Sequence, residues 1–595
     1  MDRLFGQETE YAIRFTPLEG HDRPDNALIY DALQHGIQKL VATEKSDRYN
    51  MQKQFFVENG GTFNYEYLPY APKWGLIEGA TPECYSPGEL LLYQKAQESL
   101  LIQAKPHAES YLKDFGFQGH LGLIKNCRDV EGHIYGAQEN YEAHLTTGWK
   151  LTLYRMGVFL FVLPIVLLFI TYGIVALGLI LISLGFVALY FTLLGGLKLF
   201  STLISINYLA DTVEDWGDRI WYHMTDWFES ERFKDLLILY EYRITYPIIS
   251  AVVAPYLFWQ RAFAFKAYRK SLAAFFISRP IISGAGSLVS EDCFALSEKG
   301  VALKRLFRST LGPNQRPLFD SGNLLKEVVL AVSHLFLLRL DPLKRLFKER
   351  QRFQIGLSDS NRSQMAEYLK VSTTLLMLKL HEKGYLKNAP RIKRPIKAFH
   401  SINLDPSLKA RVSVSKGMDL SALDLQKWYH QQARQWIQDS PGLEMEFIEV
   451  VKLWGEVLGL LEEDPGRLIG RLDWVTKRYL LETSGKDQSY MAKKKIDIGY
   501  HEIETGYLDK LEREGIAPKL VSDDEIEEAV KKPSSPRKVR LRSRLIRSIA
   551  YNGLKAKVSW NSVQIGTGRN RKVIDLNRMK KKAFATNKHE DTRKI

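Results

Sequence analysis

The sequence predicts an α+β protein that is interrupted by a long apolar insertion. Residues 1–147 mix short alternating apolar segments with Gly and Pro turns, which is typical of strands joined by tight turns. Residues 362–386 and 420–465 place their apolar side chains at helical spacing. Residues 156–197 contain no charged side chain, so a segment of a different kind divides the chain.

The strand-rich part contains one clear hairpin and one clear helix. FFVENGGTFNYEYL has strand–turn–strand character, with the turn at Asn59–Gly61 because glycine accepts the backbone angles of a tight turn. Residues 88–115 have apolar positions at helical spacing and predict a helix. Mixed α/β character resumes over 262–300. The break KKPSSP at 531–536 separates a small C-terminal domain with a basic tail, 537–595.

The uncharged run of 42 residues predicts membrane-spanning helices. A straight helix of this length would reach about 63 Å, about twice the ~30 Å thickness of a hydrocarbon core. The simplest solution is two helices, about 153–174 and 177–199, with a tight turn near Gly173 to Gly178. No polar stripe runs along the segment, which disfavours a buried helix of a soluble protein.

Charges at the ends of the run indicate its orientation. Lys150, Arg155 and Lys198 flank it, and the positive-inside rule then places both ends of the hairpin in the cytoplasm. Residues 204–241 combine acids with aromatics, which predicts amphipathic helices near the interface or a cap on the soluble body. A second uncharged stretch, Ile244–Gln260, has 17 residues and two prolines, so it is marginal for a span.

Composition narrows the class of protein. Hydrophobic residues at 45% and charged residues at 25% exclude a disordered or collagen-like chain. The 83 basic and 68 acidic residues give a net charge of +15, which suits anionic partners such as nucleotide phosphates or acidic lipids. Three cysteines without CxxC spacing exclude a disulfide framework and disfavour a structural zinc site. The start MDRLFGQETEY lacks the apolar core of a signal peptide.

Acidic residues in the strand-rich part are candidates for a cation site. Glu8 and Glu10 are two residues apart, so a strand would place both carboxylates on one face. Glu66 and Glu78 lie in further strand-like segments. Carboxylates gathered on a sheet repel one another unless a cation neutralises them, and hard oxygen ligands suit Mg²⁺. A solvated strand position is the alternative for each of them.

Eleven segments resemble, in order, the motifs of the Pup ligase and depupylase family. That family belongs to the carboxylate–amine ligases and is related to glutamine synthetase. GQETEY resembles the family's G-[IFV]-E-T-E start. The other segments are FVENGGTFNYEYL, IEGATPEC, IKNCRDVEGHIYGAQENY, RPIISGAGSL, QRPLFD, FQIGLSDSN, LKVSTTLLMLKLHE, RLDWVTKRYLL, KIDIGYHEI and RKVRLRSRLIR. The segment between the matches, about 148–267, has no motif counterpart and is expected to be the membrane insertion.

The resemblance implies a glutamine-synthetase-like α+β catalytic domain with an antiparallel sheet, built from 1–147 and 268–530. It implies ATP and Mg²⁺ as cofactors. In the ligase branch, ATP phosphorylates the side-chain carboxylate of the C-terminal Glu of Pup, a small protein tag. A lysine amine then displaces the phosphate to form an isopeptide bond. The implied partners are a Pup-like tag or glutamyl peptide, an amine acceptor such as a membrane-protein lysine, and the lipid bilayer. No nucleic-acid partner is expected.

The resemblance also implies roles for individual residues. Glu66 stands at the position of the family's catalytic Asp. The candidate Mg²⁺ ligands are Glu8, Glu10, Glu78, Gln138 and Gln354. The candidate nucleotide-binding residues are Arg316, Asp359, Asn361 and Trp474.

Several of these positions depart from the family pattern. Glu66 is one methylene longer than Asp, which moves its carboxylate by about one bond length. Gln138 and Gln354 replace histidines. An amide oxygen can still bind Mg²⁺, but Gln does not titrate as His does. Ser358 replaces a glycine and Asn64 replaces a tyrosine. A pseudoenzyme that serves as a membrane scaffold is therefore an alternative.

Two further expectations concern topology and reaction. Both flanks of the insertion build one active site in the family, so the insertion should cross the membrane an even number of times. Ile244–Gln260 should then be interfacial or packed on the soluble body. A multi-pass protein of the inner or plasma membrane with a cytoplasmic catalytic domain is expected. The 56 positions from Glu10 to Glu66 match the short ligase spacing, with a depupylase or deamidase-like amidohydrolase as the alternative.

Overall fold

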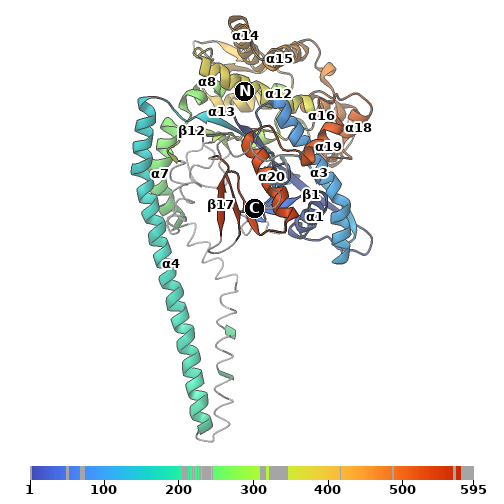
Figure 1. Ribbon diagram of the computed structural model, residues 1–595. Coiled ribbons are helices and arrows are strands. Elements are labelled where there is room, and N and C mark those ends of the chain that lie inside the picture. The colour runs from blue at the N-terminus through green and yellow to red at the C-terminus, as the bar shows by residue number, and fades with distance from the viewer. Residues whose placement is uncertain are drawn as a thin grey trace, which may run out of the picture.

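The predicted α+β class is confirmed in the computed structural model. The structure describes residues 3–47, 52–67, 74–203, 245–307, 317–320, 346–415, 417–484, 488–566 and 571–577, with isolated positions between 212 and 243. Over these residues a ten-stranded mixed sheet carries helices, and one long helix projects from the body (Figure 1).

The sheet is built around the first strand of the chain. Its order is β10-β11-β12-β7-β1-β5-β4-β3-β2, with β6 paired to the second half of β1. Its described pairs are antiparallel except β10 with β11. The strands are β1 (Phe5–Pro17), β2 (Thr43–Lys45), β3 (Phe55–Val57), β4 (Thr62–Glu66), β5 (Leu76–Ala80), β6 (Gly119–Ile124), β7 (Gln138–His144), β10 (Arg305–Phe307), β11 (Pro317–Asp320) and β12 (Arg350–Ile355).

Helices pack on one face of this sheet. Tyr11 of β1 is buried on that face, and its hydroxyl donates to Gln97 of α3 at 3.0 Å. Gly79 of β5 allows the close approach, because a Cβ atom there would lie 2.4 Å from the Gln97 side chain. The predicted helices at 88–115 and 362–386 are confirmed. The helices of this layer are α1 (Asn26–Leu40), α3 (Pro87–Asp114) and α12 (Gln364–Lys383).

Further elements complete the body beside and above these helices (Figure 1). The predicted helical region 420–465 is two antiparallel helices rather than one, divided by a short loop at Ser440–Glu444. The elements are α8 (Lys266–Ser278), α9 (Pro280–Ser283), β8 (Ser287–Ser290), β9 (Cys293–Ala295), α13 (Pro395–Asn403), β13 (Arg411–Ser413), β14 (Asp419–Ser421), α14 (Ala422–Asp439), α15 (Met445–Glu463), α16 (Asp473–Thr483), α17 (Tyr490–Gly499), α18 (Tyr507–Arg513) and α19 (Asp523–Lys531).

The predicted hairpin turn is confirmed between β3 and β4. Gly60 adopts a φ of +94°, a conformation that side chains with a Cβ atom rarely take. The Asn59 side-chain oxygen accepts from the amide of Gly61 at 2.9 Å, and the amide of Val57 donates to the Gly61 oxygen at 3.0 Å. The turn therefore holds β4, and Glu66 at its end, in register with β5.

The insertion leaves the body and returns to it at one point. The backbone oxygen of Leu145, just after β7, accepts from the amide of Phe265 at 2.7 Å. A few residues further on, Arg279 reaches back to β7 and forms a buried, two-pronged ion pair with Glu139 at 2.8 and 2.9 Å. These contacts join the chain before the insertion to the chain after it.

The predicted helical hairpin within the insertion is wrong. Residues 149–203 form one continuous helix, α4 (Trp149–Leu203), that runs straight through the expected turn at Gly173 to Gly178. The residues there read GIVALG and supply no Asn, Asp or Pro to start a turn. Two glycines cost a helix only about 2 kcal/mol relative to alanine, whereas a turn would leave backbone groups without hydrogen bonds in apolar surroundings.

The second uncharged stretch, Ile244–Gln260, packs on the base of α4. Packing on the body was one of the two placements expected for it. It forms α7 (Tyr246–Phe263), which lies antiparallel to the first turns of α4. Gln260 donates to the hydroxyl of Tyr154 at 2.7 Å, and Gly157 leaves room for the ring of Trp259. The predicted amphipathic helices at 204–241 lie almost wholly outside the described residues.

The predicted C-terminal domain begins directly after the KKPSSP break. It consists of α20 (Arg537–Tyr551), β15 (Ala556–Val558), β16 (Ser562–Ile565) and β17 (Lys572–Asp575). It packs on β2 and β3 through a small apolar core around Phe56. Fully buried Arg542 fixes it further, because it donates to the Gly60 oxygen at 2.9 Å and pairs with Glu83.

Removal of Arg279 should test how strongly the two halves of the body depend on each other. Arg279→Met leaves the buried Glu139 carboxylate without its partner, which typically costs about 3–5 kcal/mol. We expect a lower urea midpoint, followed by tryptophan fluorescence. The matched control is Lys532→Met, which breaks an exposed pair with Glu528 and should cost less than about 1 kcal/mol. Equal losses for the two variants would contradict this role of the buried pair.

Candidate active site

Four glutamates meet on the face of the sheet opposite α1 and α3. Directly paired residues of an antiparallel sheet point to one face, as do residues two apart on a strand. Glu10 of β1 pairs with Glu78 of β5, and Glu78 pairs with Asn64 of β4. Glu66 lies two residues beyond Asn64 and therefore shares their face. The sheet pairing therefore brings the carboxylates of Glu10, Glu66 and Glu78 to one face.

The two predicted glutamines join the same face from neighbouring strands. Glu8 pairs with Gln138 of β7, and Asn140, two residues further, pairs with Gln354 of β12. The amide of Gln354 donates to the side-chain oxygen of Gln138. The predicted catalytic and metal-binding side chains of β12, β7, β1, β5 and β4 thus lie on one face.

Gly136 places its backbone N–H group where it can donate to a carboxylate on this face. Gly136 has a φ of +106°, and a Cβ atom there would lie 2.2 Å from the sulfur of Cys127. Only glycine fits, and in this conformation its amide donates to the carboxylate of Glu10 at 2.8 Å. The segment before β7 thereby orients one of the four glutamates.

The glutamates repel one another strongly. Burial raises the pKa of the Glu78 carboxyl well above its usual value, and the charges of Glu8, Glu66 and Glu10 raise it further. A hydrogen bond from Asn64 at 3.1 Å opposes this shift. The face therefore attracts protons or cations, because either would relieve the repulsion.

One cation on this face was not predicted from the sequence. Arg352 of β12 contacts both carboxylate oxygens of Glu8 at 3.1 and 3.2 Å, and it also donates to Asn140 at 2.7 Å. The signal was available in RFQIG, because Arg352 lies two residues before Gln354 and must share its face. Arg352 neutralises part of the negative charge that the four glutamates create.

The side chains on this face offer the oxygen atoms that Mg²⁺ prefers, but they do not form a complete metal site by themselves. Carboxylate and amide oxygens are the hard ligands that this ion prefers. Within the residues that the structure describes, no group of three or more His, Cys, Asp or Glu side chains is close enough to hold a metal ion. Mg²⁺ usually takes one or two carboxylates and completes its shell with water and phosphate oxygens. The face therefore fits an ion that arrives with a nucleotide.

The predicted nucleotide-binding residues that the structure describes, Asp359, Asn361 and Trp474, are bonded elsewhere than on this face. Arg316 is outside the described residues. Asp359 is buried, and its carboxylate accepts from the amides of Ala285, Glu298 and Lys299 at 2.8–3.0 Å. These bonds use the carboxylate to hold two loops together, so its contacts give it a structural role.

Asn361 and Trp474 are likewise enclosed. The Asn361 side chain donates to the Ser283 oxygen at 3.0 Å and to Asp473 at 2.8 Å. The Trp474 ring is buried, and its N–H donates to the Ile281 oxygen at 2.9 Å. Both residues anchor the turn after α9 within the body. Direct nucleotide contact by either residue stays a prediction that none of these bonds supports.

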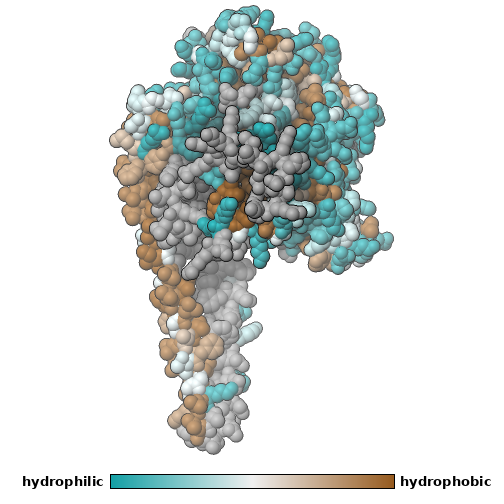
Figure 2. Space-filling model, viewed as in Figure 1, coloured by the Kyte–Doolittle hydropathy of each residue, from teal (hydrophilic) through white to brown (hydrophobic). Residues whose placement is uncertain are grey.

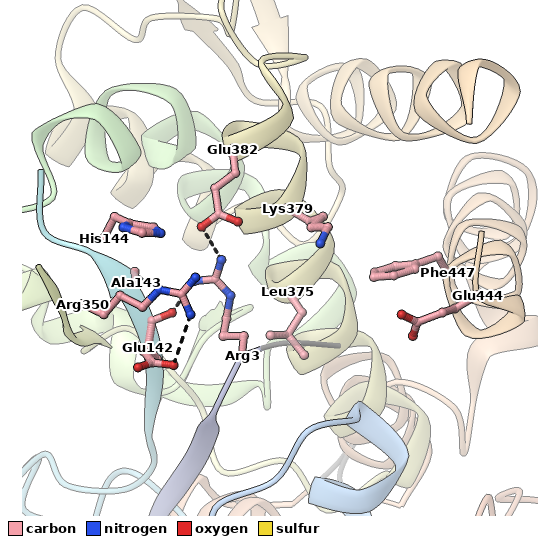
Figure 3. Close-up of a pocket in the computed structure, with 10 residues that line it drawn as sticks. All are labelled: Arg3, Glu142, Ala143, His144, Arg350, Leu375, Lys379, Glu382, Glu444 and Phe447. Carbon is pink, nitrogen blue, oxygen red and sulfur yellow. Dashed lines mark hydrogen bonds and ion pairs between the residues drawn. The ribbon is translucent and has the colours of Figure 1, made fainter. Parts of the chain in front are cut away.

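A small cavity lies elsewhere, between the start of β1 and helices α12 and α15 (Figure 3). Its volume is about 150 Å³, below the range of typical ligand pockets. Arg3 crosses it, contacting the Glu382 side chain and the backbone oxygen of Glu142. Phe447 forms the opposite wall (Figure 3). None of the predicted site residues lines this cavity.

Comparison with known proteins decides the family. A model of the Pup-ligase protein family matches residues 3–564. The chain belongs to the Pup-ligase protein family. A Pup--protein ligase of Acidimicrobium ferrooxidans is 24% identical over 582 residues, covering 96% of this chain and 94% of that protein. A Pup--protein ligase of Mycobacterium bovis is 30% identical over 232 residues, covering 38% of this chain and 51% of that protein.

Two solved structures share the fold. The complex of prokaryotic ubiquitin-like protein Pup and its ligase PafA matches with a TM-score of 0.62 at 18% identity, over 96% of this chain and 88% of that one. The Pup ligase PafA in complex with ADP matches with a TM-score of 0.57 at 18% identity, over 88% and 86%. The predicted family, α+β fold and ligase enzyme class are confirmed. The family match runs across 148–267, which the motifs alone left without a counterpart.

Replacement of Glu78 should show how far the repulsion among the four glutamates destabilises the folded chain. Its raised pKa means that the folded chain binds this proton more tightly than the unfolded chain, so stability falls as pH rises through the folded pKa. Glu78→Gln keeps an oxygen for Asn64 and removes the charge. Without divalent cations we expect thermal scans at pH 8 to give a melting temperature about 1–3 °C higher, with no difference near pH 4. Glu19→Gln, at an exposed position, is the control, and a lower melting temperature of Glu78→Gln at pH 8 would contradict the account.

Proposed function

We propose that this protein is an ATP-dependent carboxylate–amine ligase that joins a glutamyl carboxylate of a Pup-like tag to an amine. The observation that carries the proposal is the gathering of Glu8, Glu10, Glu66 and Glu78 on one open sheet face. Such a face repels ATP and a substrate carboxylate unless cations accompany them. The pairing of Glu8 with Arg352 leaves a guanidinium there that can contact phosphate oxygens.

The residues divide the work by position. Glu8, Glu10, Glu78 and the amide oxygens of Gln138 and Gln354 would bind Mg²⁺ brought by the nucleotide, with one or two carboxylates to each ion. Bound there, the ion would neutralise phosphate charge during transfer of the terminal phosphoryl group to the tag carboxylate. Glu66, at the end of β4, is the base that takes the proton from the attacking amine as phosphate leaves the acyl carbon. A base is needed because a free lysine amine has a pKa near about 10.4.

The scaffold alternative also has an observation in its favour. Gln138 and Gln354 bond to each other, and Arg352 compensates Glu8. These contacts satisfy part of the face without any cation. A chain that binds a tag without turnover would use the same fold.

We further propose that α4 tethers the enzyme to a membrane. By length and composition α4 is the one described helix able to cross a membrane alone, and α7 with α8 qualifies only as a pair bent by 73°. No described side chain of α4 between Val166 and Phe200 is buried (Figure 2). The uncharged part beyond α7, residues 166–197, has 32 residues, or about 48 Å of helix, close to the ~40–45 Å of a whole bilayer with headgroups.

The described ends of the insertion support an even number of crossings. α4 carries the chain away from the body, yet α7 lies antiparallel to its base and Phe265 bonds to Leu145. Both described ends of the insertion therefore lie on the body, which an even number of crossings requires. Both halves of the catalytic face then stay on one side, which suits a cytoplasmic catalytic domain at the inner or plasma membrane. The acceptor amine could then belong to a membrane protein.

The ligase proposal is tested by ATP-to-ADP turnover of the detergent-purified protein with Mg²⁺, with and without a candidate tag that ends in Glu. We expect tag-dependent ADP formation that falls at least about a hundredfold in Glu66→Gln, the usual scale for loss of a general base. Glu8→Gln should weaken it as well, and Glu19→Gln should leave it unchanged. If neither turnover nor a thermal shift with ATP appears, the scaffold alternative replaces the ligase.

The tether is tested by carbonate extraction of membranes from expressing cells. We expect the chain to stay in the membrane pellet. Leu181→Lys with Leu184→Lys places two charges in the middle of the exposed part of α4, each costing about 2.5–3.5 kcal/mol in a bilayer, and should release it. Met445→Lys with Ile448→Lys adds the same charge on α15 and should not. Extraction of the wild-type chain would refute the tether.

A further inference from the structure

The positive charge of the chain is concentrated at its C-terminal end. Residues 537–595 contain 18 of the 83 basic residues but only 3 of the 68 acidic ones. The preceding 536 residues therefore carry 65 of each sign and no net charge. The whole excess of +15 belongs to the small C-terminal domain and its tail, so this charge is a local feature with its own explanation.

Four of the 18 basic residues lie along a single face of α20, and the last of them, Arg547, also pairs with Glu58 at 3.1 Å. Arg537, Arg540, Arg544 and Arg547 of α20 are exposed, and their spacing of three, four and three residues aligns them along one side. The opposite side of α20 is the one packed on Phe56, where Arg542 is buried. The exposed lysines 555, 557 and 572 of the neighbouring strands extend the surface. We call α20 with these lysines the basic surface.

Apolar side chains accompany the charges. Tyr551, at the end of α20, is 91% exposed, and Val573 of β17 is 52% exposed. Basic residues next to an exposed aromatic ring are the combination found where proteins rest on a bilayer, because the ring suits the headgroup level. Figure 1 places α20 and β17 in the half of the body from which α4 projects.

We propose that the basic surface rests on the anionic headgroups of the same membrane that α4 enters. This inference deepens the proposed tether and rests on it. α4 would hold the body near the bilayer, while the basic surface would fix which side of the body faces the lipid. Each basic residue near an anionic surface changes binding about fivefold, and the effect fades over roughly 10 Å at moderate salt. The C-terminal domain packs on β2 and β3, so this contact would also orient the catalytic sheet.

The test separates the two membrane contacts. A full-length chain with Leu181→Lys and Leu184→Lys has lost the tether. We expect it to cosediment with phosphatidylcholine vesicles that contain about 30% phosphatidylglycerol, and not with pure phosphatidylcholine vesicles. Addition of Arg537→Gln, Arg540→Gln and Arg544→Gln should weaken binding at least about tenfold, as should high salt.

The matched control removes three exposed basic residues from the other half of the body. Arg391→Gln, Lys393→Gln and Arg394→Gln precede α13 and should change binding less than about twofold. Equal binding of the two triple variants overturns the proposal, as does binding to duplex DNA without binding to anionic vesicles. Because these variants lack the tether, failure here leaves the carbonate-extraction result untouched.

If the tether-free chain does not fold, hydrogen exchange of the wild-type protein in nanodiscs decides. We expect the backbone amides of α20 to exchange more slowly in discs that contain phosphatidylglycerol than in neutral discs. Exchange at α13 should be the same in both. Equal exchange at α20 in the two lipids overturns the proposal.

Discussion

The buried ion pair between Arg279 and Glu139 is the contact on which the sheet that carries the four glutamates depends. Glu139 lies on β7, before the insertion, and Arg279 lies after it, more than a hundred residues further along the chain. Isolated charges are costly inside a protein, so each of these two holds the other in place. The pair fixes β7 against the later half of the body, which supplies β12. Without this ion pair, β12 with Gln354 would no longer be held firmly beside Gln138 and Glu8.

The chemistry of that face follows from simple strand alternation. Helices occupy the opposite side, where Tyr11 and Gln97 meet, and this leaves the even-numbered side chains of β1 toward the open side. The four carboxylates on that side repel one another, and burial further disfavours the negative charge of Glu78. Arg352 relieves this repulsion in part. The balance between this internal cation and an incoming one decides how readily the face accepts a charged nucleotide.

Local patterns allowed much of the fold to be predicted, and non-local packing explains the rest. The turn at Asn59, the i and i+2 glutamates and the break before Arg537 depend on neighbouring residues, so the sequence displays them. Whether the uncharged run forms one helix or two depends on its surroundings rather than on neighbouring residues. The turn predicted near Gly173 is absent, because α4 continues through it. Asp359 was matched by motif to a nucleotide, yet loops distant in sequence surround its carboxylate. The position of Arg352 on the glutamate face follows from its spacing to Gln354, but its pairing with Glu8 of another strand does not.

The hydrogen bond from Phe265 to Leu145 holds the two ends of the insertion together. Its entry and exit lie side by side, 2.7 Å apart at these two atoms. For a loop whose ends meet in this way, each doubling of its length costs only about 0.6 kcal/mol in closure entropy. The insertion therefore occupies one seam between β7 and α8, and the first turns of α4 together with α7 add buried residues to the main core there. The same seam offers protein engineers a position for grafting α4 and α7 together onto related enzymes.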